Sequence, residues 1–212
     1  KHGFVSSTSG KIGFLNYFNE LVEKRYDTEG TYGNWFSTLK HLTIFCFGVD
    51  IQISKIDEIF LENFKDYLLR EKISNNGGRL SQNTALSYFN KVRTALKEAY
   101  RNKIISENPI LRVKTIKEKE TNREYLTLEE LQKLVKTECE VPILKQSFIF
   151  SSLTGLRFSD VKSLKWKNLY YDSENGWILK YTQQKTKGVE NLPISEQAIK
   201  LLGERKDDDV LL

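Results

Sequence analysis

The chain has 212 residues, and its 33 Lys and Arg residues against 28 Asp and Glu residues give a net charge of +5. This length suits one large domain or two small ones. The mild basicity is compatible with a nucleic-acid partner without requiring one. No apolar run approaches the roughly 18 residues of a membrane span, and no signal peptide opens the sequence. We therefore expect a soluble, cytosolic type of protein.

The cysteines and the two ends carry further information. Cys46 and Cys139 are far apart and lie in apolar or helical surroundings, which favours reduced thiols over a disulfide or a metal site. We expect neither a metal nor a cofactor. The sequence holds no methionine and closes on an apolar run at 210–212. From these features we expect a fragment of a longer protein.

The first half predicts a helical domain over residues 10–103, after a polar stretch at 1–9 that we interpret as a linker remnant. Ser54, with Asp57 three residues later, predicts the start of the third helix, and Ser81 predicts the cap of the fourth. The helices follow from apolar residues at helical spacing, at about 12–26, 32–45, 56–68 and 81–100.

The fourth predicted helix carries a polar face opposite its apolar one. The side chains of this face can all donate hydrogen bonds: Ser87, Asn90, Lys91, Thr94 and Arg101. Ordinary solvation explains such a face. Contact with DNA phosphates explains it equally, because such side chains donate to phosphate oxygens without recognising sequence.

The second half predicts a separate domain over residues 123–212. Residues 104–122 are expected to be a linker, because a proline ends any helix there and lysines interleaved with acids follow. Thr127 and Glu130 match a capping box that opens the second domain.

This second domain is predicted to be helical with a small antiparallel sheet, so the fold class is mainly α. A helix is expected over about 142–152, Ser159 is the expected N-cap of a short helix over 160–164, and Ser195 is the expected cap of a last helix. The predicted strands lie at 165–171, 177–182 and 189–193.

Arg157 is the first candidate site residue. It follows Thr154, Gly155 and Leu156, where an apolar helix ends and the chain turns before a new helix. A guanidinium stays charged and forks onto two phosphate oxygens, which suits it to hold a phosphoryl group. Simple pairing with Asp160 is the alternative, and from these residues alone we favour it.

Lys185 is the second candidate. It lies at the tip of the predicted hairpin between the last two strands. A lysine there can neutralise a phosphate or donate a proton to a departing oxygen. Hairpin tips commonly carry exposed lysines, and from these residues alone we favour simple exposure.

Several catalytic patterns are absent. The histidines are His2 and His41, and the sequence contains no HExxH, paired CxxC, P-loop, GxGxxG or GxSxG pattern. This argues against a metalloprotease, a zinc finger, an NTPase, a dinucleotide enzyme and a serine hydrolase of that type.

Taken together, these tracts resemble the tyrosine recombinases (phage-type integrases), and more narrowly the group common in Bacteroidetes mobile elements. Residues 100–109 are similar to the exit from that family's core-binding domain, and residues 125–131 to the entry to its catalytic domain. Residues 154–160 resemble the box of its first catalytic arginine. Gln184-Lys185-Thr186, followed by residues 189–193, resembles its catalytic hairpin. The order and spacing of the tracts carry the resemblance.

The resemblance implies a helical core-binding domain followed by the N-terminal part of a catalytic domain that performs metal-free DNA strand exchange. A tyrosine attacks a backbone phosphate, and the 3′-phosphotyrosyl link conserves the phosphodiester energy, so no nucleotide cofactor is needed. Arg157 would stabilise charge on the non-bridging oxygens, Lys185 would protonate the leaving 5′ oxygen, and Asp160 would orient Arg157.

Double-stranded DNA is the partner that the resemblance implies. A homotetramer on DNA and a location in the bacterial cytoplasm, with the nucleoid, are further family expectations. The expected DNA contacts come from both halves of the chain: Lys40, His41, Ser87, Asn90, Lys91, Thr94, Arg101, Thr186 and Lys187.

The family's HxxR box and nucleophilic tyrosine normally follow the hairpin, and no tyrosine of this sequence has that context. We therefore expect the chain as given to bind DNA without cleaving it. A catalytically silent DNA-binding or regulatory module derived from an integrase is the alternative. A helical interaction protein is a third hypothesis.

Overall fold

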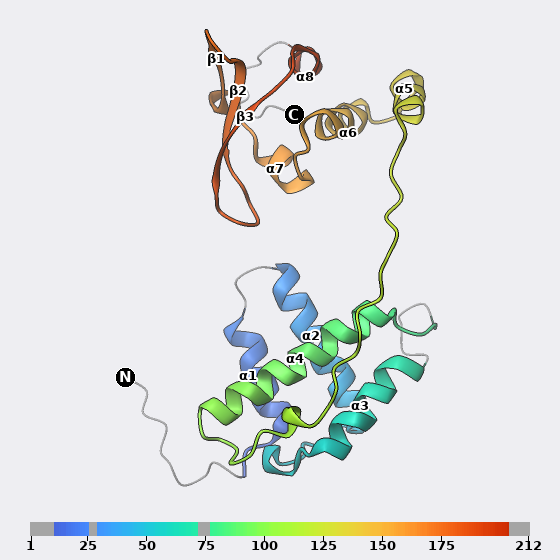
Figure 1. Cartoon of the computed structure of the whole chain (residues 1–212), viewed down its shortest axis with the longest axis vertical. Coiled ribbons are helices and arrows are strands. Elements are labelled where there is room, and N and C mark those ends of the chain that lie inside the picture. The colour runs from blue at the N-terminus through green and yellow to red at the C-terminus, as the bar shows by residue number, and fades with distance from the viewer. Residues whose placement is uncertain (1–10, 26–28, 72–76, 204–212) are drawn as a thin grey trace. The chain divides into compact units, whose positions relative to one another are not determined.

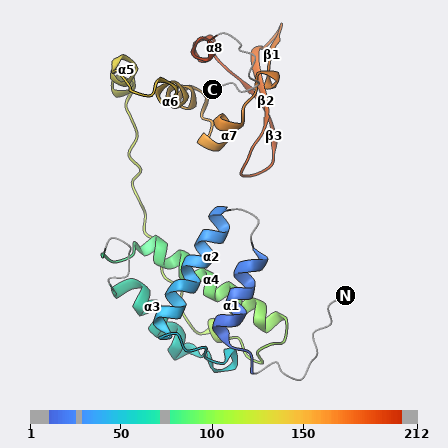
Figure 2. The ribbon, with the colours of Figure 1, turned by 180° about the vertical axis from the view of Figure 1, so that it is seen from behind.

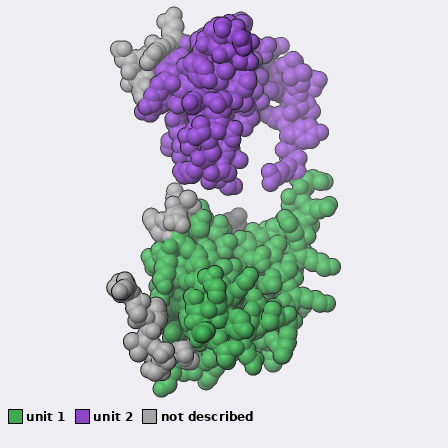
Figure 3. Space-filling model, turned by 60° about the vertical axis from the view of Figure 1, so that its left-hand side comes forward, with its two compact units in different colours: residues 1–122 green, residues 123–212 purple. Residues whose placement is uncertain are grey.

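The computed structural model describes residues 11–25, 29–71 and 77–203 (Figure 1). The chain divides into two compact units, residues 1–122 and 123–212, which Figure 3 colours separately. Each unit buries its own cluster of apolar side chains.

The described residues of the first unit form helices joined by irregular segments, and no β-strand. α4 packs against α2 and α3, and α1 packs against α2 (Figure 1, Figure 2). Phe18, Phe64 and Phe89 are fully buried in its core. The elements are α1 (Phe14–Lys24), α2 (Glu29–Phe45), the 3-10 helix η1 (Ile53–Lys55), α3 (Glu58–Arg70), α4 (Gln82–Arg101) and the 3-10 helix η2 (Pro109–Leu111).

Short polar side chains start two of these helices. Ser81 accepts a hydrogen bond from the Thr84 N–H at 3.1 Å, which confirms the predicted cap of α4. The predicted start of the third helix at Ser54 is wrong, because residues 53–55 form η1 and Asp57 caps α3. Burial of the isoleucines on both sides of Ser54 holds this turn against the core before the helix begins.

The segment predicted as a linker, residues 104–122, lies partly in the core of the first unit. Asn83 of α4 donates to the Lys119 carbonyl at 2.8 Å and accepts from the Lys119 N–H at 2.9 Å. Composition did not reveal this packing, because widely spaced apolar residues form neither a run nor a regular period. The buried side chains are Ile105, Ile110, Val113 and Ile116.

The second unit combines helices with a three-stranded antiparallel sheet of order β1-β2-β3, which confirms the predicted fold class. α6 packs against α5, α7 and α8. Its elements are α5 (Leu128–Lys136), α6 (Pro142–Thr154), α7 (Phe158–Ser163), the 3-10 helix η3 (Trp166–Asn168), β1 (Leu169–Asp172), β2 (Gly176–Thr182), β3 (Val189–Pro193) and α8 (Glu196–Leu202).

Local signals in the second unit were mostly accurate. Thr127 and Glu130 form the predicted capping box of α5, and Ser195 caps α8 by accepting from the Ala198 N–H at 3.3 Å. The first strand begins later than predicted. Asn168 turns the chain before the strand, because its side chain accepts from the Lys165 N–H at 2.8 Å.

No helix in the described part of the chain is both long and apolar enough to cross a bilayer. Among the same residues, no group of three or more His, Cys, Asp and Glu side chains is arranged to hold a metal ion. Cys46 is a buried free thiol and Cys139 an exposed one.

The start of α1 depends on a residue far along the chain. Asp50 accepts from the Leu15 N–H at 2.7 Å and from the Asn16 N–H at 3.3 Å. A Cβ at position 13 would lie 1.9 Å from the Asp50 carboxylate, so glycine at Gly13 leaves room for this cap.

We expect Asp50→Ala to lower the free energy of unfolding by about 1 kcal/mol, because two helix N–H groups lose their partner. Gly13→Ala should lose a similar amount. The double variant should lose little more, since both changes remove the same cap. Urea denaturation measures all three. Asp57→Ala, which removes only the cap of α3, is the matched control. Its loss in free energy of unfolding should add fully to that of Asp50→Ala or of Gly13→Ala.

The explanation is contradicted if the Gly13–Asp50 double variant loses as much free energy of unfolding as the two single variants lose together.

Candidate functional site

Arg157 stands at the junction between α6 and α7. Gly155 turns the chain after α6 with a φ of 70°, a left-handed backbone that favours glycine. Leu156 and Val161 are buried on either side of the arginine, whose own side chain is half exposed. Their burial fixes the main chain from which the guanidinium extends.

The predicted N-cap of this helix, Ser159, is wrong. Arg157 is the N-cap residue, and its carbonyl accepts from the Asp160 N–H at 2.9 Å and the Val161 N–H at 3.0 Å. The preference of serine for caps is local, whereas burial of Leu156 and Val161 starts the first turn two residues earlier.

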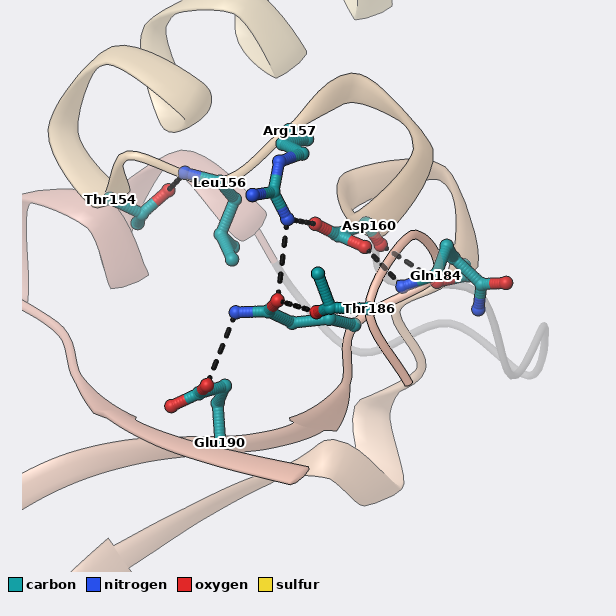
Figure 4. Close-up of polar contacts among 9 residues, drawn as sticks. Thr154, Leu156, Arg157, Asp160, Gln184, Thr186 and Glu190 are labelled. Atoms are coloured by element: carbon teal, nitrogen blue, oxygen red, sulfur yellow. Dashed lines mark hydrogen bonds and ion pairs between the residues drawn. The ribbon is translucent and has the colours of Figure 1, made fainter. Parts of the chain in front are cut away.

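Asp160 carries the buried charge of this region, with 2% of its side chain exposed. Its Oδ1 accepts from the main-chain N–H of Gln184 at 2.7 Å, and its Oδ2 lies 3.9 Å from Arg157 Nη1 (Figure 4). The first contact is a short, charge-assisted hydrogen bond, whereas the second is a long ion pair with a half-exposed arginine. Asp160 therefore holds the hairpin more firmly than it holds Arg157.

The loop between β2 and β3, residues 183–188, carries the other predicted site residues of this unit. Lys185, Thr186 and Lys187 are all exposed. Because Asp160 binds the main chain of Gln184, the structure brings this loop together with the tract that carries Arg157.

Gln183 is a residue of this region that sequence reasoning missed. Its Oε1 accepts from Arg157 Nη1 at 3.3 Å and from the Thr186 hydroxyl, and its Nε2 donates to Glu190 Oε1 at 3.2 Å (Figure 4). Strand alternation supplies a signal that would have found it. Gln183 follows Tyr181 by two positions, and Tyr181 pairs with Glu190 in the β2–β3 ladder, so the three share a face.

Two tyrosines of the sheet, Tyr171 and Tyr181, make packing contacts. Burial raises the pKa of the Tyr181 phenol, and the charges of Asp160 and Glu190 raise it further. The Tyr171 ring meets the Trp177 ring edge-on at 5.3 Å. Tyr181 is partly buried against the rest of the unit and Tyr171 packs on a neighbouring ring, so both side chains contribute to the packing of the sheet.

The residues predicted on the polar face of α4 lie in the first unit. Asn90 accepts from the Thr115 hydroxyl at 3.3 Å, so part of this face holds the chain segment that follows η2. Lys91 and Arg101 form no ion pair among the described residues. The five differ in exposure, with two exposed and three partly buried: Thr94 and Arg101, then Ser87, Asn90 and Lys91.

Lys40 and His41 lie on α2 in different surroundings. Lys40 is exposed, whereas His41 is 8% exposed, with its ring 5.2 Å from that of Tyr88 and its Nδ1 3.4 Å from the Tyr67 hydroxyl. Burial lowers the pKa of His41, and the neighbouring charge of Lys40 lowers it further. A neutral, enclosed ring is a weak phosphate ligand, and DNA contact by His41 stays a prediction.

The fold of both units is that of integrases solved with DNA. A lambda integrase dimer bound to a COC′ core site has a TM-score of 0.67 at 17% identity, over 96% of this chain and 58% of that chain. A lambda integrase tetramer bound to a Holliday junction has a TM-score of 0.68 at 19% identity, over 95% and 60%. The Tn1549 transposon integrase in complex with circular intermediate DNA has a TM-score of 0.66 at 15% identity, over 92% and 66%. The chain thus spans less than two thirds of each.

A model of the phage integrase SAM-like domain matches residues 13–119, which is half of the chain. The chain therefore belongs to the phage integrase family of tyrosine recombinases. A comparison with curated proteins found no match. The narrower assignment to the Bacteroidetes group stays a prediction.

The lowered pKa of His41 makes stability depend on pH. The unfolded chain protonates this histidine near pH 6.5 and the folded chain does so only at lower pH, so the unfolded state holds more protons between the two pKa values. We expect full stability above about pH 6.5 and a loss as the pH falls through the folded pKa. Urea midpoints measured at about pH 7.5 and 5.5 test this. His41→Gln should weaken the pH dependence, and an unchanged dependence in that variant contradicts the assignment.

Asp160→Ala should release the 183–188 loop. The change leaves the Gln184 N–H without its acceptor, and an unpaired buried partner costs about 1–3 kcal/mol. We expect a lower thermal midpoint for the second unit and faster hydrogen exchange at the Gln184 amide. Asp172→Ala is the matched control, because Asp172 accepts from two main-chain N–H groups in the β1–β2 turn. Hydrogen exchange at the Gln184 amide should be unchanged in the control. If this amide stays protected in Asp160→Ala, the hydrogen bond to Asp160 does not hold the loop.

Proposed function

We propose that this chain acts in site-specific DNA recombination, with Arg157 and Lys185 directed at one backbone phosphate of duplex DNA. The observation that carries the proposal is the buried Asp160 carboxylate. It binds the lysine-bearing loop at 2.7 Å and lies 3.9 Å from Arg157, so two segments distant in sequence share one anchor.

Arg157 supplies the charge that phosphoryl transfer requires. Its guanidinium is half exposed, and its own contacts are a long ion pair and one neutral amide oxygen. It therefore retains donors for the non-bridging phosphate oxygens, where charge develops in the transition state.

Lys185 would act as the general acid. As the oxygen of a tyrosine hydroxyl forms a bond to phosphorus and releases its proton to water, the bond from phosphorus to the 5′ oxygen breaks, and the lysine ammonium transfers its own proton to that 5′ oxygen. The products are a 3′-phosphotyrosyl link and a free 5′ hydroxyl. We assign no tyrosine of this chain as the nucleophile. Lys185 is exposed and has no ion pair among the described residues, which leaves its ammonium accessible.

The first unit would bind the duplex by phosphate contacts. Lys91 and Arg101 of α4 and Lys40 of α2 are its best-placed cations among the predicted contacts, and Thr186 and Lys187 would add contacts from the second unit. Such binding weakens steeply as salt rises. Solved integrases of the same fold are bound to DNA, one as a tetramer on a Holliday junction, which supports duplex DNA as the partner and a homotetramer as the active assembly.

A silent DNA-binding module derived from an integrase is the second candidate function. Its support is that His41, which lies in the first unit, is enclosed by Tyr67 and Tyr88, and that the described residues of the second unit include no histidine.

A nicked duplex substrate tests the proposal with the intact protein, because the nick traps the covalent intermediate. We expect an adduct on denaturing gels, and Arg157→Ala should lower its rate of formation about a hundredfold or more. Lys167→Ala, an exposed cation on η3, is the control and should retain the adduct. An undiminished rate in Arg157→Ala refutes the role of that residue. DNA binding with no adduct in the wild type favours the silent module.

A further inference from the structure

The loop that carries Lys185 is closed at its base by main-chain hydrogen bonds. The Gln183 N–H donates to the Gly188 carbonyl at 2.8 Å, and the Lys187 N–H donates to the Gln183 carbonyl at 2.9 Å. Lys187 has a φ of 59°, so the chain leaves the loop through a left-handed residue that non-glycine side chains disfavour. Neither main-chain bond involves Lys185, so its position depends on how its neighbours are held.

Each sequence neighbour of Lys185 is held by a different side chain. Asp160 binds the main-chain N–H of Gln184 at 2.7 Å on one side. On the other side, the Thr186 hydroxyl donates to Gln183 Oε1 (Figure 4). These two hydrogen bonds restrain the backbone on both sides of Lys185, while its side chain stays exposed.

The orientation of the Gln183 amide is determined by its partners. Arg157 can only donate and the Glu190 carboxylate can only accept, so the oxygen must face Arg157 and the nitrogen must face Glu190. One neutral oxygen thus receives a hydrogen bond from the arginine and another from the loop. A neutral acceptor orients Arg157 without cancelling the charge that would bind phosphate.

We propose that Gln183 is a positioning residue that sets Lys185 relative to Arg157 for proton transfer to the leaving oxygen. This inference rests on the proposed function. Gln183 contacts neither the DNA nor the reacting atoms. It acts by accepting hydrogen bonds from both Thr186 and Arg157 on one amide oxygen. A small displacement of a catalytic group is enough to slow a reaction about a hundredfold, so loss of these hydrogen bonds has a measurable effect.

A substrate with sulfur in place of the bridging 5′ oxygen isolates the proton-transfer step. A thiolate leaves without a proton, because a thiol has a pKa near 8.5, far below that of an alcohol. Lys185→Ala should therefore be slow on the oxygen substrate and close to wild type on the sulfur substrate. Arg157→Ala should be slow on both, since its role is to stabilise charge on the other oxygens.

Gln183→Met is the decisive variant, because it preserves the length of the side chain and removes its hydrogen bonds. We expect adduct formation to slow about tenfold or more on the oxygen substrate and to stay within about threefold of wild type on the sulfur substrate. Thr186→Val removes the hydrogen bond from the Thr186 hydroxyl to Gln183, and should slow the reaction more on the oxygen substrate than on the sulfur substrate, by a smaller factor than Gln183→Met does. Gln132→Met on the exposed surface of α5 is the matched control and should be unaffected on both substrates.

Two results would overturn the inference. One is an undiminished rate for Gln183→Met on the oxygen substrate, and the other is an equal loss on both substrates, which would place the effect on Arg157 or on folding. Hydrogen exchange at the Gln183 and Lys187 amides, measured on the 212-residue chain, shows whether the base of the loop survives the substitution. A wild-type protein that forms no adduct refutes the proposed function itself, whereas an active wild type with a fully active Gln183→Met refutes only this inference.

Discussion

The buried carboxylate of Asp160 is the constraint on which the candidate site depends. A charge with 2% of its side chain exposed requires strong partners, and it has the Gln184 N–H at 2.7 Å and Arg157 at 3.9 Å. Because α7 and the 183–188 loop are separated by β1 and β2, this one side chain fixes two distant segments to each other. Gln183 makes a second connection from within the loop. The main chains that carry Arg157 and Lys185 are thereby fixed to each other, as a site that binds phosphate with two cations requires.

In the first unit, neutral amide side chains of α4 likewise bind the main chain of a segment distant in sequence. The side chain of Asn83 pairs twice with the main chain of Lys119, and Gln82 donates to the Lys117 carbonyl at 2.7 Å. α4 therefore buries apolar side chains on one face and holds an extended segment on another. The polar face predicted to bind DNA shares its residues with this structural task, since Asn90 contacts Thr115. Lys91 and Arg101 are the members of that face with unpaired charge among the described residues.

Sequence patterns predicted structure accurately where the interaction is local. Ser81, Thr127 and Ser195 each bind an N–H three residues away, so the caps can be recognised without knowing the fold. The predictions at Ser54 and Ser159 failed because burial of neighbouring apolar residues, which a cap motif does not reveal, moved the helix start. The burial of four apolar side chains within residues 104–122 was also missed, because these side chains are too widely spaced to form a run or a regular period.

Local sequence was sufficient for the existence and order of the main helices and strands, though not for every start, and for the arginine before α7, the lysine at the hairpin tip and the resemblance to integrases. It could not show that Asp160 binds the hairpin main chain, that Gln183 bridges Arg157 and Thr186, or that His41 is enclosed by Tyr67 and Tyr88. Caps and periodicities involve residues within a few positions of each other. The burial of a carboxylate, an amide or an imidazole depends instead on which distant segments exclude water from it, and that is settled only when the chain is folded.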